Sequence, residues 1–188
     1  MKTNFFIAAL ILLLSYTPSL AQNPVLETIF QRKSVRTYTD KPVTLESLVT
    51  LVKAGMAAPT GMNRQPWEFY VVQGAEAMKK LSDSIPRMKM LKEAQAVIVV
   101  IGNPEKSSYW YLDCSAAAQN ILLAAESLGL GAVWTAGYPY EERMNEIANA
   151  LSIPLPYRPL CLIPIGYPKG QQTPKNKWVE SKMHLNKW

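Results

Sequence analysis

The sequence predicts a single domain of the α/β (α+β) class, in which helices flank a central mixed sheet. Two observations support this prediction. Stretches with apolar residues at helical spacing alternate along the chain with short, continuously apolar runs of strand length. The chain also contains no internal repeat or low-complexity tract, and the 167 residues that remain when a 21-residue leader is set aside from the 188 suit one compact core.

The leader, Met1–Ala21, is predicted to be a secretory signal peptide. A basic start containing Lys2 precedes the apolar run "FFIAALILLLSY", and a small-residue cleavage pattern ending at Ala21 follows. The apolar run is shorter than the roughly 20 residues that a spanning helix needs, so an uncleaved anchor is the weaker interpretation. No Cys follows the cleavage pattern and no twin-Arg precedes the apolar run, so we expect general export to the periplasm, with no stable membrane span after cleavage.

The remaining chain is expected to fold as helices interleaved with strands. The expected helices cover residues 23–32, 43–58, 109–128 and 140–151, and the expected strands cover residues 67–72, 96–102, 131–137 and 160–168. Capping and breaking residues set several limits: Thr44 is the expected N-cap of the second helix, Pro59 closes it, and Gly129 stops the third. The first helix carries one apolar face, formed by Val25, Leu26, Ile29 and Phe30.

The last twenty residues, 169–188, are expected to form an extended arm. They carry five Lys against one Glu and are interrupted by Pro, so they do not read as core. Trp178, Met183, Leu185 and Trp188 nevertheless give this segment apolar surface to bury. We therefore expect the arm to lie on another surface, such as a partner subunit.

Composition excludes several classes of site. Removing Met1–Ala21 takes away one cation and leaves 19 Lys and Arg against 14 Asp and Glu, a net charge of +5, which an anionic ligand explains without nucleic acid. Cys114 and Cys161 lie in apolar segments and read as small buried thiols, although a disulfide stays open in an oxidising compartment. With His184 as the single histidine, no metal site and no Ser-His-Asp arrangement is expected, and no catalytic side chain is assigned.

Two basic clusters stand at opposite ends of the domain. The first, in "QRKSVR", contains Arg32, Lys33 and Arg36 around the Ser34 hydroxyl, and the second contains Lys175 and Lys177. Solvated surface charge is the alternative, and composition alone favours it. Guanidinium forks, an ammonium and a hydroxyl within one turn are, however, well suited to phosphate oxygens.

An irregular loop, "APTGMNRQPWEF" at residues 58–69, separates a predicted helix from a predicted strand. Its two prolines, its glycine and the carboxamides of Asn63 and Gln65 would present amide groups to a planar, polar ligand. The alternative is an ordinary loop that connects a helix to a strand and binds no ligand. Neither this loop nor the basic clusters are specific by themselves.

Taken in order, these motifs resemble the nitroreductase family of FMN-dependent oxidoreductases. The ordered set is "RKSVR", "APTGMNRQPWEF", "DCSAAAQNILLAAESLGLGAVWTAGYP", "PIGYP" and "PKNKW", and it covers essentially the whole mature chain. The resemblance implies that residues 22–188 form one nitroreductase-like FMN-binding domain. It also implies an intertwined homodimer with one FMN in each of two interface sites, and a C-terminal arm that extends over the partner subunit.

The resemblance also assigns residues to the cofactor. Arg32, Lys33 and Ser34 would contact the FMN phosphate and ribityl chain, joined at the phosphate by Lys175 and Lys177. Arg36 would reach the pyrimidine edge of the flavin, where a cation stabilises the negative charge of the reduced ring. The residues expected from the partner subunit are Pro59, Thr60, Gly61 and Asn63.

The backbone at Ala136 and Gly137 would lie beside the reactive flavin N5, where an amide donor favours arrival of hydride and a glycine permits close approach. Two residues depart from the family pattern. Lys177 stands where relatives often have Arg, which replaces a bidentate fork with a point charge. Ala136 stands where some relatives have Glu, which removes a side chain from the pocket.

The activity that the resemblance implies is ping-pong oxidoreduction with NAD(P)H or another donor. The acceptor would be a nitroaromatic, a quinone or a related small molecule, and the flavin would carry the chemistry. Nicotinamides are scarce outside the cytoplasm, so an exported flavin-binding protein without nicotinamide-driven turnover is a second hypothesis. A third takes the basic clusters as a membrane-surface or polyanion patch on a structural domain.

Overall fold

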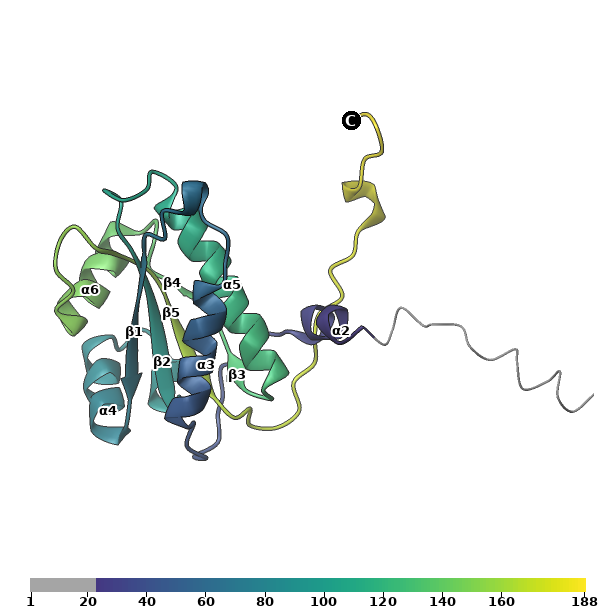
Figure 1. The fold of residues 1–188 in the computed structure, drawn as a ribbon. Coiled ribbons are helices and arrows are strands. Elements are labelled where there is room, and N and C mark those ends of the chain that lie inside the picture. Colours follow the sequence, from purple (N-terminus) through teal and green to yellow (C-terminus); the bar gives the residue numbers. More distant parts are fainter. Residues whose placement is uncertain (1–22) are drawn as a thin grey trace, which may run out of the picture.

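The structure is a computed structural model that describes residues 23–188, so the predicted signal peptide lies outside the described residues. Helices cover both faces of one sheet, and α2 and the C-terminal segment extend away from this body (Figure 1). The helices are α2 (Pro24–Gln31), α3 (Leu45–Met56), α4 (Ala75–Ser84), α5 (Trp110–Ser127) and α6 (Glu141–Leu151), and the strands are β1 (Trp67–Gln73), β2 (Ala96–Gly102), β3 (Gly131–Ala132), β4 (Thr135–Ala136) and β5 (Arg158–Gly166).

The sheet has the order β1-β2-β5-β3, with β4 also paired to β5. Every pairing between these strands is antiparallel. Among the described residues, parallel pairing is confined to an isolated bridge between Ser34 and Ala132, outside the named strands, so the sheet itself is antiparallel and not mixed as expected. This bridge brings the first basic cluster to the β3 edge of the sheet.

Strand β2 shows how the sequence divides the core into two layers. All seven of its residues are buried, and they alternate between the two faces of the sheet. Ile98 and Val100 pack in the cluster under α3 and α5, whereas Val97 and Val99 pack in the cluster that includes side chains of α4 and α6. A strand covered on both faces in this way reads as a continuous apolar run, which is why the sequence predicted it at the limits observed.

Most of the expected elements are present, within a residue or two at their ends. The Thr44 side chain caps α3, accepting a hydrogen bond of 3.2 Å from the Ser47 amide, and Gly129 adopts φ +69° just after α5. The expected strand at 131–137 is divided into β3 and β4, which keep one register on β5 on either side of Val133 and Trp134.

Helix α4 has no counterpart among the predictions. Its N-cap is Gly74, which has no side chain to cap the helix, and its buried positions are confined to Met78, Leu81 and Ser82. Its apolar signal in the sequence is therefore sparse. The helix nevertheless closes the second face of the sheet, where it contacts α6 and β1.

Both ends of the described chain leave the body on the same side. Residues 167–169 run beside residues 37–39, with the Lys169 amide donating to the Thr37 carbonyl at 3.1 Å. The arm then passes α2 (Figure 1). This helix has no buried residue, and of its predicted apolar face Val25, Ile29 and Phe30 are exposed and Leu26 is half-buried. Among the residues that the structure describes, no helix combines the length and apolarity that crossing a membrane requires.

Candidate functional site

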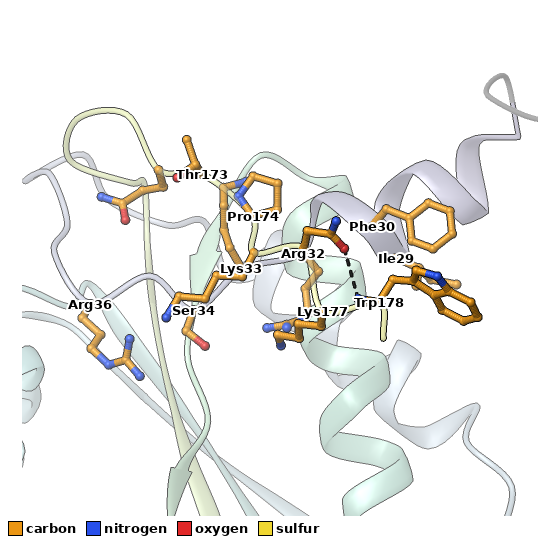
Figure 2. Close-up of a pocket in the computed structure, with 13 residues that line it drawn as sticks. Ile29, Phe30, Arg32, Lys33, Ser34, Arg36, Thr173, Pro174, Lys177 and Trp178 are labelled. Atoms are coloured by element: carbon orange, nitrogen blue, oxygen red, sulfur yellow. Dashed lines mark hydrogen bonds between the residues drawn. The ribbon is translucent and has the colours of Figure 1, made fainter. Parts of the chain in front are cut away.

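A cavity of about 850 Å³ lies between the segment that follows α2 and the C-terminal arm. Its walls come from residues 29–36, at the end of α2 and just beyond it, and from residues 172–178 of the arm. Figure 2 shows Arg36 at one end of the cavity, Phe30 and Trp178 at the other, and Arg32 and Lys177 between them. The two basic clusters predicted from the sequence therefore meet at one site.

The first wall is anchored by Val35. This side chain is 1% exposed, and its amide donates to the Ala132 carbonyl at 3.0 Å. Gly131 makes room for it, because a Cβ at Gly131 would lie 2.6 Å from a Val35 methyl. Since successive side chains of an extended segment point to opposite sides, the buried Val35 turns its neighbours Ser34 and Arg36 outward to the cavity.

Tyr38 holds the same segment from below. Its hydroxyl donates to the Val35 carbonyl at 2.7 Å and also lies 3.1 Å from the Pro164 carbonyl. Burial is the main reason why the pKa of the Tyr38 hydroxyl is raised well above its usual value. The hydroxyl therefore stays protonated and keeps its role as donor at all physiological pH values.

Lys33, which is predicted to contact the phosphate and ribityl chain, has an acidic partner within the chain. Its ammonium forms an ion pair with Glu126 of α5 at 2.7 Å, and both side chains are largely buried, with exposed fractions of 20% and 17%. Lys33 also lines the cavity. The structure therefore uses this charge to tie the basic turn to α5, 93 residues further along the chain.

The other cations of the site lack such partners. In residues 23–188, Arg32, Arg36, Lys175 and Lys177 form no ion pair with a carboxylate, and no Asp or Glu lines the cavity. Four positive charges around one cavity repel one another and raise the local potential. The arrangement is that of a binding site for an anionic group.

The sequence predictions missed the apolar part of the wall. Ile29 and Phe30 precede the first basic cluster, Pro174 and Trp178 flank the second, and all four line the cavity. Phe30 is 70% exposed and Trp178 is 67% exposed. The signal was an aromatic residue beside each cationic cluster, a pattern that suits a ligand carrying both a flat ring and an anionic group.

The predicted loop residues do not line this cavity. Pro59, Thr60, Gly61 and Asn63 lie at the end of α3, apart from the basic turn and the arm. The Gly61 amide donates to the carboxylate of Asp113, at the start of α5, at 2.9 Å. Within one chain the structure thus separates the loop from the cationic pocket.

Ala136 and Gly137, the remaining predicted residues, are also outside the cavity lining. The Gly137 amide donates to the Leu160 carbonyl at 2.9 Å, and a Cβ at Gly137 would lie 2.8 Å from the Pro159 carbonyl. Gly137 therefore permits close approach of the chain to β5. Hydrogen-bonded and non-hydrogen-bonded residue pairs alternate along an antiparallel ladder. Because the Gly137 amide bonds to Leu160, the adjacent Ala136–Cys161 pair is non-hydrogen-bonded, and the Ala136 amide is directed away from β5.

The two cysteines are free, buried thiols. Burial, with a smaller contribution from Asp113, raises the pKa of Cys114 to about 12, and burial also raises the pKa of Cys161. Within the described residues no cluster of His, Cys, Asp or Glu could hold a metal ion.

The protein is an α+β domain whose cationic cavity is lined by the turn after α2 and by the C-terminal arm. The family profile described as "Nitroreductase family" matches residues 29–88 and 86–167. The chain belongs to the nitroreductase family and is an oxidoreductase of that family.

Individual proteins show the same similarity. A solved structure from Bacteroides thetaiotaomicron, provisionally named an NADH dehydrogenase/NAD(P)H nitroreductase, is 51% identical and superposes with a TM-score of 0.84 over 88% of this chain and 99% of that one. A protein of Methanothermobacter thermautotrophicus with the same provisional name is 41% identical over 167 residues, 87% of each chain. A provisionally named nitroreductase of Desulfovibrio desulfuricans, solved in complex with FMN, is 30% identical with a TM-score of 0.76 over 88% of this chain and 98% of that one.

Proposed function

We propose that the cationic pocket binds FMN. The chain would then use NAD(P)H or another donor to reduce nitroaromatic, quinone or related small acceptors. The observation that carries this proposal is the meeting of Arg32, Arg36, Lys175 and Lys177 around a cavity that no carboxylate lines. The FMN complex of a relative that is 30% identical supports the choice of cofactor.

The residues present fit FMN in size and in chemistry. A cavity of about 850 Å³ lies within the range of roughly 300 to 1,000 Å³ typical of cofactor pockets. Arg32, Lys175 and Lys177 supply the charge that a phosphate needs, and Ser34 supplies a hydroxyl for the phosphate or the ribityl chain. Phe30 and Trp178 add apolar surface at the far end.

A bound FMN would supply the redox chemistry, taking up two electrons from a donor and delivering them to an acceptor. The residues of the chain bind and orient the cofactor. A guanidinium at Arg36 placed against the pyrimidine edge would favour the negative charge that develops there on reduction. Of the two backbone positions predicted near N5, we assign the donor to Ala136, because the Gly137 amide is engaged with Leu160.

The complete site requires a second copy of the chain. Ring contacts from Pro59, Thr60, Gly61 and Asn63 are not available to the pocket of their own chain, because these residues lie at the end of α3. The exposed apolar side chains of α2 and the arm also need a covering surface, Phe30 and Trp188 among them. We therefore propose a homodimer in which each loop lines the partner's flavin.

We also propose that the chain is exported, with cleavage after Ala21, and acts in the periplasm. N-terminal sequencing of the mature protein should then begin at Gln22 or within a few residues of it. A product that retains Met1 would contradict export by this route.

Flavin binding and turnover can be tested separately. Purified protein loaded with FMN should show the flavin absorbance bands, and NAD(P)H should bleach them before a quinone or nitroaromatic restores them. Flavin bands that NAD(P)H does not bleach would favour the second hypothesis, an exported flavin-binding protein without nicotinamide-driven turnover. No bands at all would overturn the proposal and favour the polyanion-patch hypothesis.

A further inference from the structure

The loop at residues 59–65 has an unusual backbone. Met62, Asn63 and Gln65 have φ values of 52°, 54° and 46°, in the left-handed region that side chains other than glycine rarely adopt. Each such residue costs free energy, so the conformation persists only where its surroundings determine it. Identifying what holds the loop in this shape therefore identifies part of the proposed flavin site.

Most hydrogen bonds of the loop are internal to it. The Gln65 amide donates to the Thr60 hydroxyl at 3.2 Å, and the Gln65 carboxamide donates to the Asn63 side-chain oxygen at 2.8 Å. The guanidinium of Arg64 reaches the Lys106 carbonyl at 3.0 Å, but this contact is exposed. These bonds shape the loop without fixing it to the core.

Asp113 supplies the fixed point. Its side chain is 6% exposed, and one carboxylate oxygen accepts from the Gly61 amide at 2.9 Å. The other oxygen accepts from the Ser107 hydroxyl at 3.0 Å, and that hydroxyl in turn accepts from the Tyr109 amide at 3.1 Å. Both oxygens are therefore engaged, one by the loop and one by the turn that begins α5.

We infer that Asp113 is a positioning residue, which ties the 59–65 loop to α5 and so holds the loop in the shape it presents to the partner's flavin. The flavin part of this inference rests on the proposed function. Asp113 itself is buried beneath the loop and reaches a ligand only through Gly61. Removing its carboxylate orphans the Gly61 amide, and the left-handed residues that follow lose their anchor.

Limited trypsin digestion of the protein without flavin tests the hold on the loop, because Arg64 is exposed and lies within it. In Asp113→Ala, cleavage after Arg64 should accelerate at least fivefold, without matching acceleration after Lys79 or Lys80 in α4. Asp113→Asn, which keeps one acceptor oxygen for Gly61, should fall between Asp113→Ala and wild type. Leu81→Ala, a core substitution in α4, is the matched control for general destabilisation.

Flavin titration tests the consequence. Asp113→Ala should raise the Kd values of FMN and riboflavin by the same factor, about tenfold, as expected when a buried group loses its hydrogen-bond partner. Unchanged cleavage after Arg64 in both Asp113 variants, or equal acceleration in Leu81→Ala, would overturn the inference. If wild type binds no flavin, the proposed function fails, and the cleavage rates still decide whether Asp113 holds the loop.

Discussion

The proposal that Arg32, Lys175 and Lys177 bind one phosphate makes a quantitative prediction about two ligands that differ only in that phosphate. Arg32→Ala and Lys177→Ala should weaken the binding of FMN more than that of riboflavin. The two variants should also differ, because Arg32 is half-buried whereas Lys177 is exposed in the described chain. Losing a partner from a buried charge-assisted contact costs about 2 kcal/mol at the low end, whereas an exposed ion pair contributes about 1 kcal/mol.

These free energies correspond to increases in the Kd of FMN of about thirtyfold for Arg32→Ala and about fivefold for Lys177→Ala. The Kd of riboflavin should stay within about twofold of wild type in both. Titration with quenching of flavin fluorescence measures both constants. Raising the salt concentration should shrink the effect of Lys177→Ala more than that of Arg32→Ala, because added ions screen an exposed charge more effectively than a half-buried one.

Two further variants serve as controls for the clamp. Arg36→Ala should weaken FMN and riboflavin alike and lower the reduction potential of bound FMN, because its proposed partner is the ring. Lys79→Ala, in an exposed pair with Asp83 far from the cavity, should change neither Kd. The phosphate assignment is refuted if Arg32→Ala binds FMN as wild type does, or loses FMN and riboflavin by equal factors.

Three other predictions follow from the structure. Lys33→Ala and Glu126→Ala should each raise the Kd of FMN about threefold. The double variant should bind FMN no more weakly than either single variant, because both single substitutions break the same ion pair, and additive losses would contradict a positioning role. Deleting residues 178–188 should convert a dimer to a monomer in sedimentation velocity, and an unchanged dimer would show that the arm is not part of the interface. Between about pH 9 and 12 the free energy of unfolding should fall less in Cys114→Ala than in wild type. In that range the Cys114 thiol ionises in the unfolded chain but stays protonated in the folded one, because its folded pKa is raised, and ionisation therefore favours unfolding of the wild type. Equal falls in the two proteins, measured by denaturant titration across this pH range, would exclude this contribution.

The parts of the molecule that the sequence predicted well are those in which local pattern and burial agree. The run from Ala96 to Gly102 could only be a strand covered on both faces, and the alternation of apolar and small residues from Trp110 to Ser127 suits a helix packed against α3. Capping residues such as Thr44 set limits that the structure keeps. Local chemistry likewise marked the two basic clusters.

The parts that the sequence could not predict depend on contacts between distant residues. Nothing near Lys33 indicates that Glu126 will neutralise it, and nothing near Gly61 indicates that Asp113 will hold it. Both partners lie on α5, the helix whose register against the sheet decides which side chains reach the edges. The family resemblance also placed the backbone of both Ala136 and Gly137 near N5 without choosing between their amides, and only the structure shows that the Gly137 amide is occupied by Leu160.

The position of the cavity between residues 29–36 and 172–178 determines when during maturation a cofactor can bind. A ligand in the cavity contacts both segments and so links the N-terminal part of the domain to the C-terminal arm. A chain threaded from its N-terminus across a membrane would present its first wall early and its second wall last, so a cofactor could be captured only once translocation is complete. The bound cofactor would then protect the arm from carboxypeptidases, and trimming of the arm would release the cofactor.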